Sequence, residues 1–212
     1  MLSRLFLCTA CAALIAAPAF AKDKPAPSAV EPVACEGVYG IDSSGDLLID
    51  TFGEENVHTG FVDGPEGTQY IATTVYPGDP EREMIFSWLD EDRLEKPSFI
   101  ELSPSQAGPH GVRLGMSVAE VEAINGQAFD IGGFWWDYGG SAPIEEGTLA
   151  GPQNGDCYVS VSFSPQDDIP ASIDVTPVSG EVVVRSDLPL LAEIDTRVTS
   201  LSLGYALDPI EE

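Results

Sequence analysis

Hydrophobic and polar residues alternate along most of the chain with a period of two, which is typical of strands half buried in a sheet. In residues 157–163, for example, the apolar side chains of Val159, Val161 and Phe163 are each preceded by a more polar residue. Turn signals such as Asn154-Gly155 separate the alternating segments. The pattern predicts two groups of four strands, at residues 56–63, 69–76, 83–89 and 98–102, and at 129–138, 147–150, 157–163 and 171–176.

One segment, Gly111 to Gly126, has the pattern of a capped helix instead. Ser117 and Glu120 form the S-x-x-E capping box, in which each side chain satisfies the other's free backbone N–H. Gly126 stands where a left-handed C-terminal cap is needed. Because Gly-Met-Ser differs from the G-x-S-x-G nucleophile elbow, we assign Ser117 to helix capping and not to catalysis.

A weaker capping box, Ser43 with Asp46, precedes the apolar residues 47–52, which Gly53 ends. Gly53 and Gly126 are 73 residues apart. The predicted strands at 85–89 and 98–102 match 159–163 and 172–176 at a separation of 74. The repetition predicts an internal duplication, although periodic β-rich sequence could produce the same matches.

The predicted fold is therefore α+β and predominantly β, with two related units that each contain a helix followed by an antiparallel sheet. We place unit 1 at residues 35–103 and unit 2 at residues 111–180. The C-terminal residues 181–212 should add strands near 181–185 and 197–205, around a short piece at 188–192.

The N-terminal residues 1–21 have the composition of a secretory signal peptide: one basic residue, a short apolar run and an A-x-A end. We predict cleavage after Ala21, although lipidation at Cys11 is an alternative that the upstream Cys8 disfavours. Residues 22–34 contain three prolines and should form a poorly ordered leader, with order beginning near Cys35. No later segment is apolar enough to span a membrane. The protein should be periplasmic or secreted.

Two cysteines, Cys35 and Cys157, remain after cleavage. An even pair in an exported chain predicts a disulfide. The alternative is a redox-active or metal-binding pair, but the chain has no C-x-x-C motif and no cluster of histidines.

The formal net charge of the chain is −26, and of the chain without residues 1–21 it is −27. Nucleic acid and anionic lipid are therefore not expected as partners, because binding phosphate needs basic patches. The acids are scattered in short clusters that predict a solvated surface. Binding of a divalent cation at one cluster is an alternative, but no spacing matches an EF-hand loop. No motif predicts a metal or a cofactor.

The best candidate for a functional site is the aromatic run Phe134–Tyr138. On a strand, Phe134, Trp136 and Tyr138 would share one face, and Trp135 and Asp137 the other. Large aromatic side chains on both faces are more than a half-buried strand needs, so one face could bind a ligand or partner. The alternative is that Trp135 only covers a helix or the other unit.

No catalytic set can be identified from the residue types. His58 and His110 are the only histidines, and neither belongs to a motif that pairs it with a nucleophile or with metal ligands. Two carboxylates would suffice for glycoside hydrolysis, but the chain offers 35 acids and no spacing that selects a pair.

The segment Gly111–Gly126 resembles the helix opening of small bacterial envelope proteins of the SmpA/OmlA (BamE-like) kind. That resemblance implies short helices on a three-stranded antiparallel sheet, but this chain lacks the lipobox of those lipoproteins. The tandem arrangement is similar to the beta-lactamase-inhibitor-protein architecture. Residues 133–140, Gly-Phe-Trp-Trp-Asp-Tyr-Gly-Gly, resemble a segment of uncharacterised exported bacterial proteins, which implies no activity.

Together these patterns predict an exported, non-enzymatic binding or envelope-interaction protein. Its partner would be an unknown envelope protein or glycan, bound through Trp135, Trp136, Asp137 and Tyr138. Two alternatives stay open. One is a hydrolase of envelope glycans or peptides that uses paired carboxylates. The other is a periplasmic protein inhibitor, which only the architectural likeness suggests.

Overall fold

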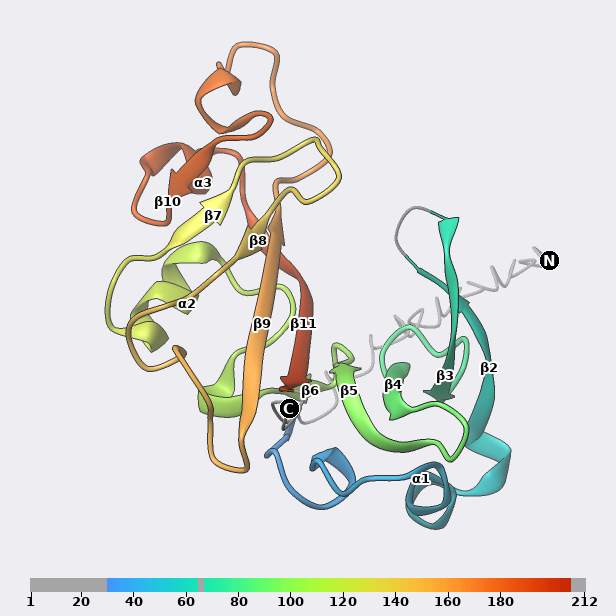
Figure 1. Ribbon diagram of the computed structural model, residues 1–212. Helices are drawn as coiled ribbons and strands as arrows, with labels where there is room; N and C mark the ends of the chain where they lie inside the picture. Colours follow the sequence, from blue (N-terminus) through green and yellow to red (C-terminus); the bar gives the residue numbers. More distant parts are fainter. Residues whose placement is uncertain (1–29, 65–66, 207–212) are drawn as a thin grey trace, which may run out of the picture.

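The computed structural model describes residues 30–64 and 67–206. It has an α+β fold dominated by strands, as the alternating pattern predicts (Figure 1). The predicted signal peptide, residues 1–21, and most of the predicted leader lie outside the described residues. Within the described part of the chain, no helix is long and apolar enough to cross a membrane.

The helices are short, and strands form the framework. The α-helices are α1 (Gly45–Phe52), α2 (Val118–Asn125) and α3 (Pro189–Glu193), with 3-10 turns η1 (Gly37–Tyr39), η2 (Glu54–Asn56), η4 (Pro109–Gly111) and η5 (Thr176–Val178). The longer strands are β2 (Val57–Asp63), β3 (Gln69–Val75), β4 (Met84–Asp90), β5 (Glu95–Glu101), β9 (Cys157–Ser164) and β11 (Arg197–Tyr205). The short strands are β1 (Glu31–Pro32), β6 (Gln106–Ala107), β7 (Asp130–Gly132), β8 (Ser141–Ala142) and β10 (Val183–Arg185).

Seven strands form one sheet in the order β2-β3-β4-β5-β11-β9-β8, and every neighbouring pair is antiparallel. Strands β2 to β5 are the meander that the first group of predicted strands describes. Strand β11, predicted only as an addition after unit 2, instead lies in the middle of the sheet between β5 and β9 (Figure 1). The C-terminal strand therefore joins the two halves.

The centre of the sheet is the pair formed by Ile100 of β5 and Leu203 of β11, both fully buried. One strand outward on each side, Phe86 pairs with Ile100 and Val159 pairs with Leu203. Phe86 and Val159 are 73 residues apart, whereas Ile100 and Leu203 are 103 apart, so the pairing about this centre gives no constant separation. The internal duplication stays a prediction.

Residues 147–150 do not form the predicted strand, because the side chain of Asn125 forms hydrogen bonds with backbone groups of this segment. The Nδ2 group of Asn125 donates to the carbonyl oxygen of Glu146 (2.9 Å), and its Oδ1 accepts from the N–H of Leu149 (3.0 Å). Gly147 has a φ of 102°, and a Cβ there would lie 2.4 Å from that Oδ1. The segment wraps around the end of α2 instead of pairing with a strand.

Residues 171–176 also do not form the predicted strand. Their backbone groups are used in local turns: the N–H of Ile173 donates to Pro170 (2.9 Å), and the N–H of Thr176 donates to the Asp174 carboxylate (3.0 Å). In the sheet, the position beside β9 is taken by β11. The separation of 74 therefore relates a strand to a loop in this part of the chain.

The predicted leader is ordered earlier than expected. Strand β1 pairs in parallel with β6, and Val33 is only 4% exposed. Two backbone hydrogen bonds, from Glu31 to Ser105 (2.8 Å) and from Val33 to Ala107 (2.7 Å), secure this segment. The three prolines of the segment predicted disorder, but Pro32 lies on a two-residue strand whose pairing does not need its missing N–H.

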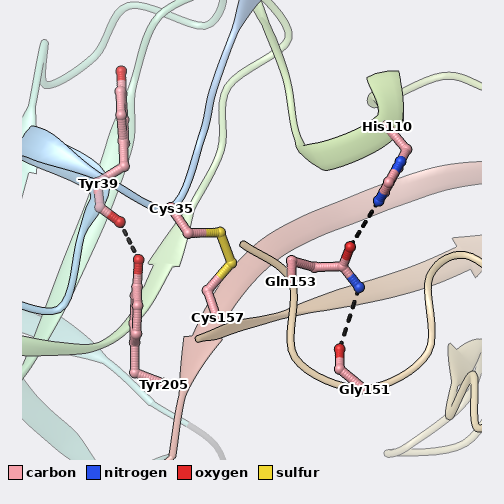
Figure 2. The surroundings of a disulfide bond; sticks show 7 residues. All are labelled: Cys35, Tyr39, His110, Gly151, Gln153, Cys157 and Tyr205. Atoms are coloured by element: carbon pink, nitrogen blue, oxygen red, sulfur yellow. Dashed lines mark hydrogen bonds between the residues drawn. A yellow bond between two sulfur atoms is a disulfide. The ribbon is translucent and has the colours of Figure 1, made fainter. Parts of the chain in front are cut away.

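The predicted disulfide between Cys35 and Cys157 is present and lies in the core, where the two residues are 4% and 0% exposed. Cys157 pairs with Tyr205 across β9 and β11. The Tyr205 hydroxyl donates a hydrogen bond to the carbonyl oxygen of Tyr39, close to Cys35 (Figure 2). The disulfide therefore joins the segment around Cys35 to the first residue of β9, and the hydrogen bond joins Tyr39 to the last residue of β11.

Helix α2 begins as its sequence predicts. The Ser117 Oγ accepts from the N–H of Glu120 (3.3 Å), and the Glu120 carboxylate accepts from the N–H of Ser117 (2.8 Å). Gly126 ends the helix in the left-handed conformation, with a φ of 81°. In α1 the cap is one residue later than predicted: Ser44 caps Leu47 (3.2 Å), whereas Ser43 is buried.

Replacing Ser117 by alanine should lower the free energy of unfolding by about 1 kcal/mol, the usual effect of losing a serine cap. Urea denaturation at pH 7 measures this, and Ser160→Ala, at an exposed serine of β9, is the control. The N–H and hydroxyl of Ser117 hold the pKa of Glu120 below its usual range. The contribution of this carboxylate is therefore present above its unfolded pKa of about 4.3 and is lost as the pH falls. A gap between the wild type and Ser117→Ala that widens on acidification would contradict the cap.

Candidate functional site

The aromatic segment Phe134–Tyr138 is a loop and not the predicted strand at 129–138. Strand β7 ends at Gly132, and the following residues turn back towards β8. Trp135 has a φ of 62°, in the left-handed region, which interrupts the alternation of faces. The predicted division of these side chains between two faces of a strand is therefore wrong.

Backbone hydrogen bonds anchor both ends of this aromatic loop, which we define as residues 133–140. At its start, the N–H of Gly133 donates to Val182 (2.7 Å) and the N–H of Phe134 donates to Val178 (2.7 Å). At its end, the carbonyl of Gly140 accepts from the N–H of Phe163 in β9 (2.8 Å). The loop is irregular in conformation, but its two ends have fixed positions.

Two glycines allow the aromatic loop to approach its neighbours closely. A Cβ on Gly140 would lie 1.9 Å from the carbonyl oxygen of Phe163, and the φ of Gly140 is 80°. A Cβ on Gly133 would lie 2.4 Å from the carbonyl oxygen of Gly180. Any larger residue would have to push the loop away from β9 or from the segment before β10.

The three aromatic residues at the start of the loop have different environments. Phe134 is 2% exposed and belongs to the core, and its ring meets the indole of Trp135 edge-on at 5.9 Å. Trp136 is half-buried, and its Nε1 donates to the carbonyl oxygen of Gly133 (2.7 Å). Trp135 is 56% exposed. The alternative in which Trp135 only covers a helix or the other unit stays a prediction, although more than half of the side chain is in solvent.

The aromatic loop forms one wall of an open pocket with a volume of about 570 Å³. The opposite wall is formed by residues 164–175, which begin with the last residue of β9 and continue as an irregular segment. The lining residues are Phe134, Trp135, Trp136 and Gly139 from the loop, and Ser164, Pro165, Gln166, Asp167, Ile169, Pro170, Ala171, Ile173 and Val175 from the segment.

Of the four predicted binding residues, Trp135 and Trp136 line this pocket, whereas Asp137 and Tyr138 are exposed outside it. The Tyr138 ring instead meets the Trp136 ring edge-on at 5.6 Å. Sequence reasoning missed the whole opposite wall. The prolines and acids of residues 165–170 marked a turn, but nothing in them shows that it would face the aromatic loop.

The pocket is acidic and contains no base among its lining residues. Asp167 is the one carboxylate that lines it within the described chain, and no lysine or arginine does so. Among the described carboxyl groups, the one whose pKa is raised lies elsewhere: burial, and secondarily the charge of Glu83, raise the pKa of Glu101 on β5. Paired carboxylates, as the hydrolase alternative requires, do not meet at this pocket.

The other residues considered for chemistry do not join the aromatic loop. His58 is exposed on β2, and the Nε2 of His110 forms a hydrogen bond with the side-chain oxygen of Gln153 (2.8 Å; Figure 2). Ser117 is occupied in the cap of α2. In residues 30–64 and 67–206, no three side chains of His, Cys, Asp or Glu are grouped closely enough to hold a metal ion.

Comparison of the chain with protein-family models, with curated proteins and with solved structures gives no match. The BamE-like and inhibitor-like resemblances therefore stay predictions. The aromatic loop and the pocket beside it are the features of the described molecule from which a function can be argued.

Proposed function

We propose that this protein is an exported, non-enzymatic binding protein whose ligand lies between the aromatic loop and residues 164–175. The observation that carries the proposal is the exposed indole of Trp135 on a loop with two fixed ends. Tryptophan contributes more to binding energy than most residues, because it buries a large area and loses little conformational entropy. A tryptophan that is kept in water by rigid backbone is typical of a binding surface.

The backbone of Trp135 supports the same proposal. A bulky residue in the left-handed region costs about 1–3 kcal/mol, and such residues cluster at ligand-binding sites. The surrounding hydrogen bonds of Gly133, Phe134 and Gly140 are what keep this conformation. Six other described non-glycine residues also have a positive φ, so the backbone of Trp135 supports binding only together with the exposure of its indole.

Location and charge limit the partner. We infer a signal peptide at residues 1–21, cleavage after Ala21, and a place in the periplasm or outside the cell. The Cys35–Cys157 disulfide fits an oxidising compartment. With a formal charge of −27 after cleavage, the partner is an envelope protein or glycan in preference to nucleic acid or anionic lipid. The single carboxylate in the pocket does not favour the hydrolase alternative.

Two tryptophan variants test the proposal. Trp135→Ala should change the free energy of unfolding by less than about 1 kcal/mol, because the side chain is mostly in water. Trp136→Ala should cost more than about 2 kcal/mol, because it removes a half-buried ring and a hydrogen bond. Thermal and urea denaturation measure both. An equal loss of stability in the two variants would show that Trp135 is part of the packing.

Binding is measured with the same variants. The immobilised wild-type protein should retain material from a fractionated cell envelope, and Trp135→Ala should retain much less of it at unchanged stability. Tyr158→Ala is the matched control, because Tyr158 is an exposed aromatic residue of β9 outside the pocket. The proposal fails if Trp135→Ala and the wild type retain the same material.

A further inference from the structure

We infer that the pocket binds a neutral saccharide ring, stacked on the indole of Trp135. This inference rests on the proposed binding function and adds the chemical class of the ligand. A sugar ring has a face of C–H groups and an edge of hydroxyl groups. Its site therefore needs an exposed aromatic surface beside side chains that form hydrogen bonds without carrying positive charge.

Trp135 supplies the aromatic surface. The face of an aromatic ring carries negative charge density, which attracts the C–H groups of a sugar. The indole is braced by the Phe134 ring, which meets it at an interplanar angle of 75°. Phe134 itself is fixed, because its N–H donates to Val178 (2.7 Å) and its carbonyl accepts from Gly180 (2.9 Å). The backbone next to Trp135 is therefore held in place before binding, which reduces the conformational entropy lost when a ligand binds.

The opposite wall supplies the hydrogen-bonding groups. The side chains of Gln166 and Asp167 are exposed and form no hydrogen bond with the described residues. Ser164 adds a hydroxyl whose oxygen accepts a long hydrogen bond from Thr199 Oγ1 (3.4 Å). The backbone of Gln166 is held by its N–H, which donates to Ile194 (3.1 Å). An amide offers donors and an acceptor, and a carboxylate offers acceptors. This combination matches sugar hydroxyls, which both donate and accept.

The charges around the pocket select against anionic sugars. Asp167 lies in the lining, Asp168 follows it at the surface, and no lining residue is basic. A uronate or phosphorylated glycan would meet like charge with no basic partner. A neutral sugar has no net charge for these carboxylates to repel, so its affinity should change little with ionic strength.

The test is a calorimetric titration of the exported chain with three neutral trisaccharides, maltotriose, cellotriose and chitotriose, and with trigalacturonate as the anionic match. We expect at least one neutral trisaccharide to bind with a similar Kd at about 0.05 M and about 0.5 M salt. Trp135→Ala should weaken this binding about tenfold or more, and Trp135→Phe should weaken it less. Gln166→Ala should weaken it several-fold. Tyr158→Ala should leave it unchanged.

Three results would overturn the inference: no binding of any neutral trisaccharide at about 10 mM, tighter binding of trigalacturonate, or an affinity that falls steeply with salt. These results separate the two proposals. If no trisaccharide binds but immobilised Trp135→Ala retains less envelope material than the wild type, only the saccharide inference is wrong. If Trp135→Ala retains as much envelope material as the wild type, the binding function is wrong as well.

Discussion

Removing the disulfide between Cys35 and Cys157 should lower the free energy of unfolding by about 4–5 kcal/mol, on the basis of loop entropy. The two cysteines are 122 residues apart in the sequence, so the bond restricts most of the unfolded chain. The measurement is guanidinium denaturation of the wild type and of the double variant Cys35→Ala/Cys157→Ala. Denaturation in a reducing agent is the control: it should destabilise the wild type but not the double variant, which has no disulfide to reduce.

The structure says what remains when the disulfide is lost. The hydroxyl of Tyr205 still donates to Tyr39, and burial raises the pKa of both tyrosines to about 12. Tyr205→Phe should therefore cost about a further 1 kcal/mol in the double variant, because a buried carbonyl loses its donor. Two free thiols in the denatured, unreduced wild type that begins at Lys22, or a double variant as stable as the wild type, would contradict this role.

Replacing Gly140 by alanine should lower the free energy of unfolding by more than about 3 kcal/mol. The φ of 80° already disfavours alanine, and its Cβ would lie 1.9 Å from the carbonyl oxygen of Phe163. Gly126→Ala is the matched control: its φ is 81°, but a Cβ there meets nothing within 4 Å. The control should cost only about 1 kcal/mol, and urea denaturation compares the two.

The same substitution should also damage the pocket. Gly140 attaches the aromatic loop to β9 through the N–H of Phe163, so alanine would displace one wall relative to the other. Gly140→Ala should therefore lose ligand retention at temperatures where it is still folded, whereas Gly126→Ala should not. If Gly140→Ala costs no more than Gly126→Ala, the contact with Phe163 has no structural role.

Features that depend on neighbouring residues or on composition were predicted well from the sequence. The capping box of α2 needs only Ser117 and Glu120, three residues apart. The alternation in β9 leaves Cys157, Val161 and Phe163 buried and Tyr158 exposed, as the period of two predicts. The disulfide followed from the number of cysteines in an exported chain, because no other partner was available to either.

Only one wall of the candidate pocket, the aromatic loop, was noticed in the sequence. The composition of residues 133–140 drew attention to Trp135 and Trp136, but their conformation depends on long-range bonds to Val182, Val178 and Phe163. The opposite wall, residues 164–175, has no signal of its own, because prolines and acids are common to many surface loops.

The sequence by itself determined the α+β class, the short capped helices, the meander of unit 1, the disulfide and the acidic charge, since each depends on local spacing or on composition. Only the tertiary structure decided which segments became neighbours. The Asn125 side chain forms hydrogen bonds with the backbone of Glu146 and Leu149, and β11 pairs with β9. Gly133 and Gly140 allow the close contacts that hold the aromatic run as a loop. The reason is physical: buried backbone groups must find partners, and the partner that is nearest in space is not encoded by the local pattern.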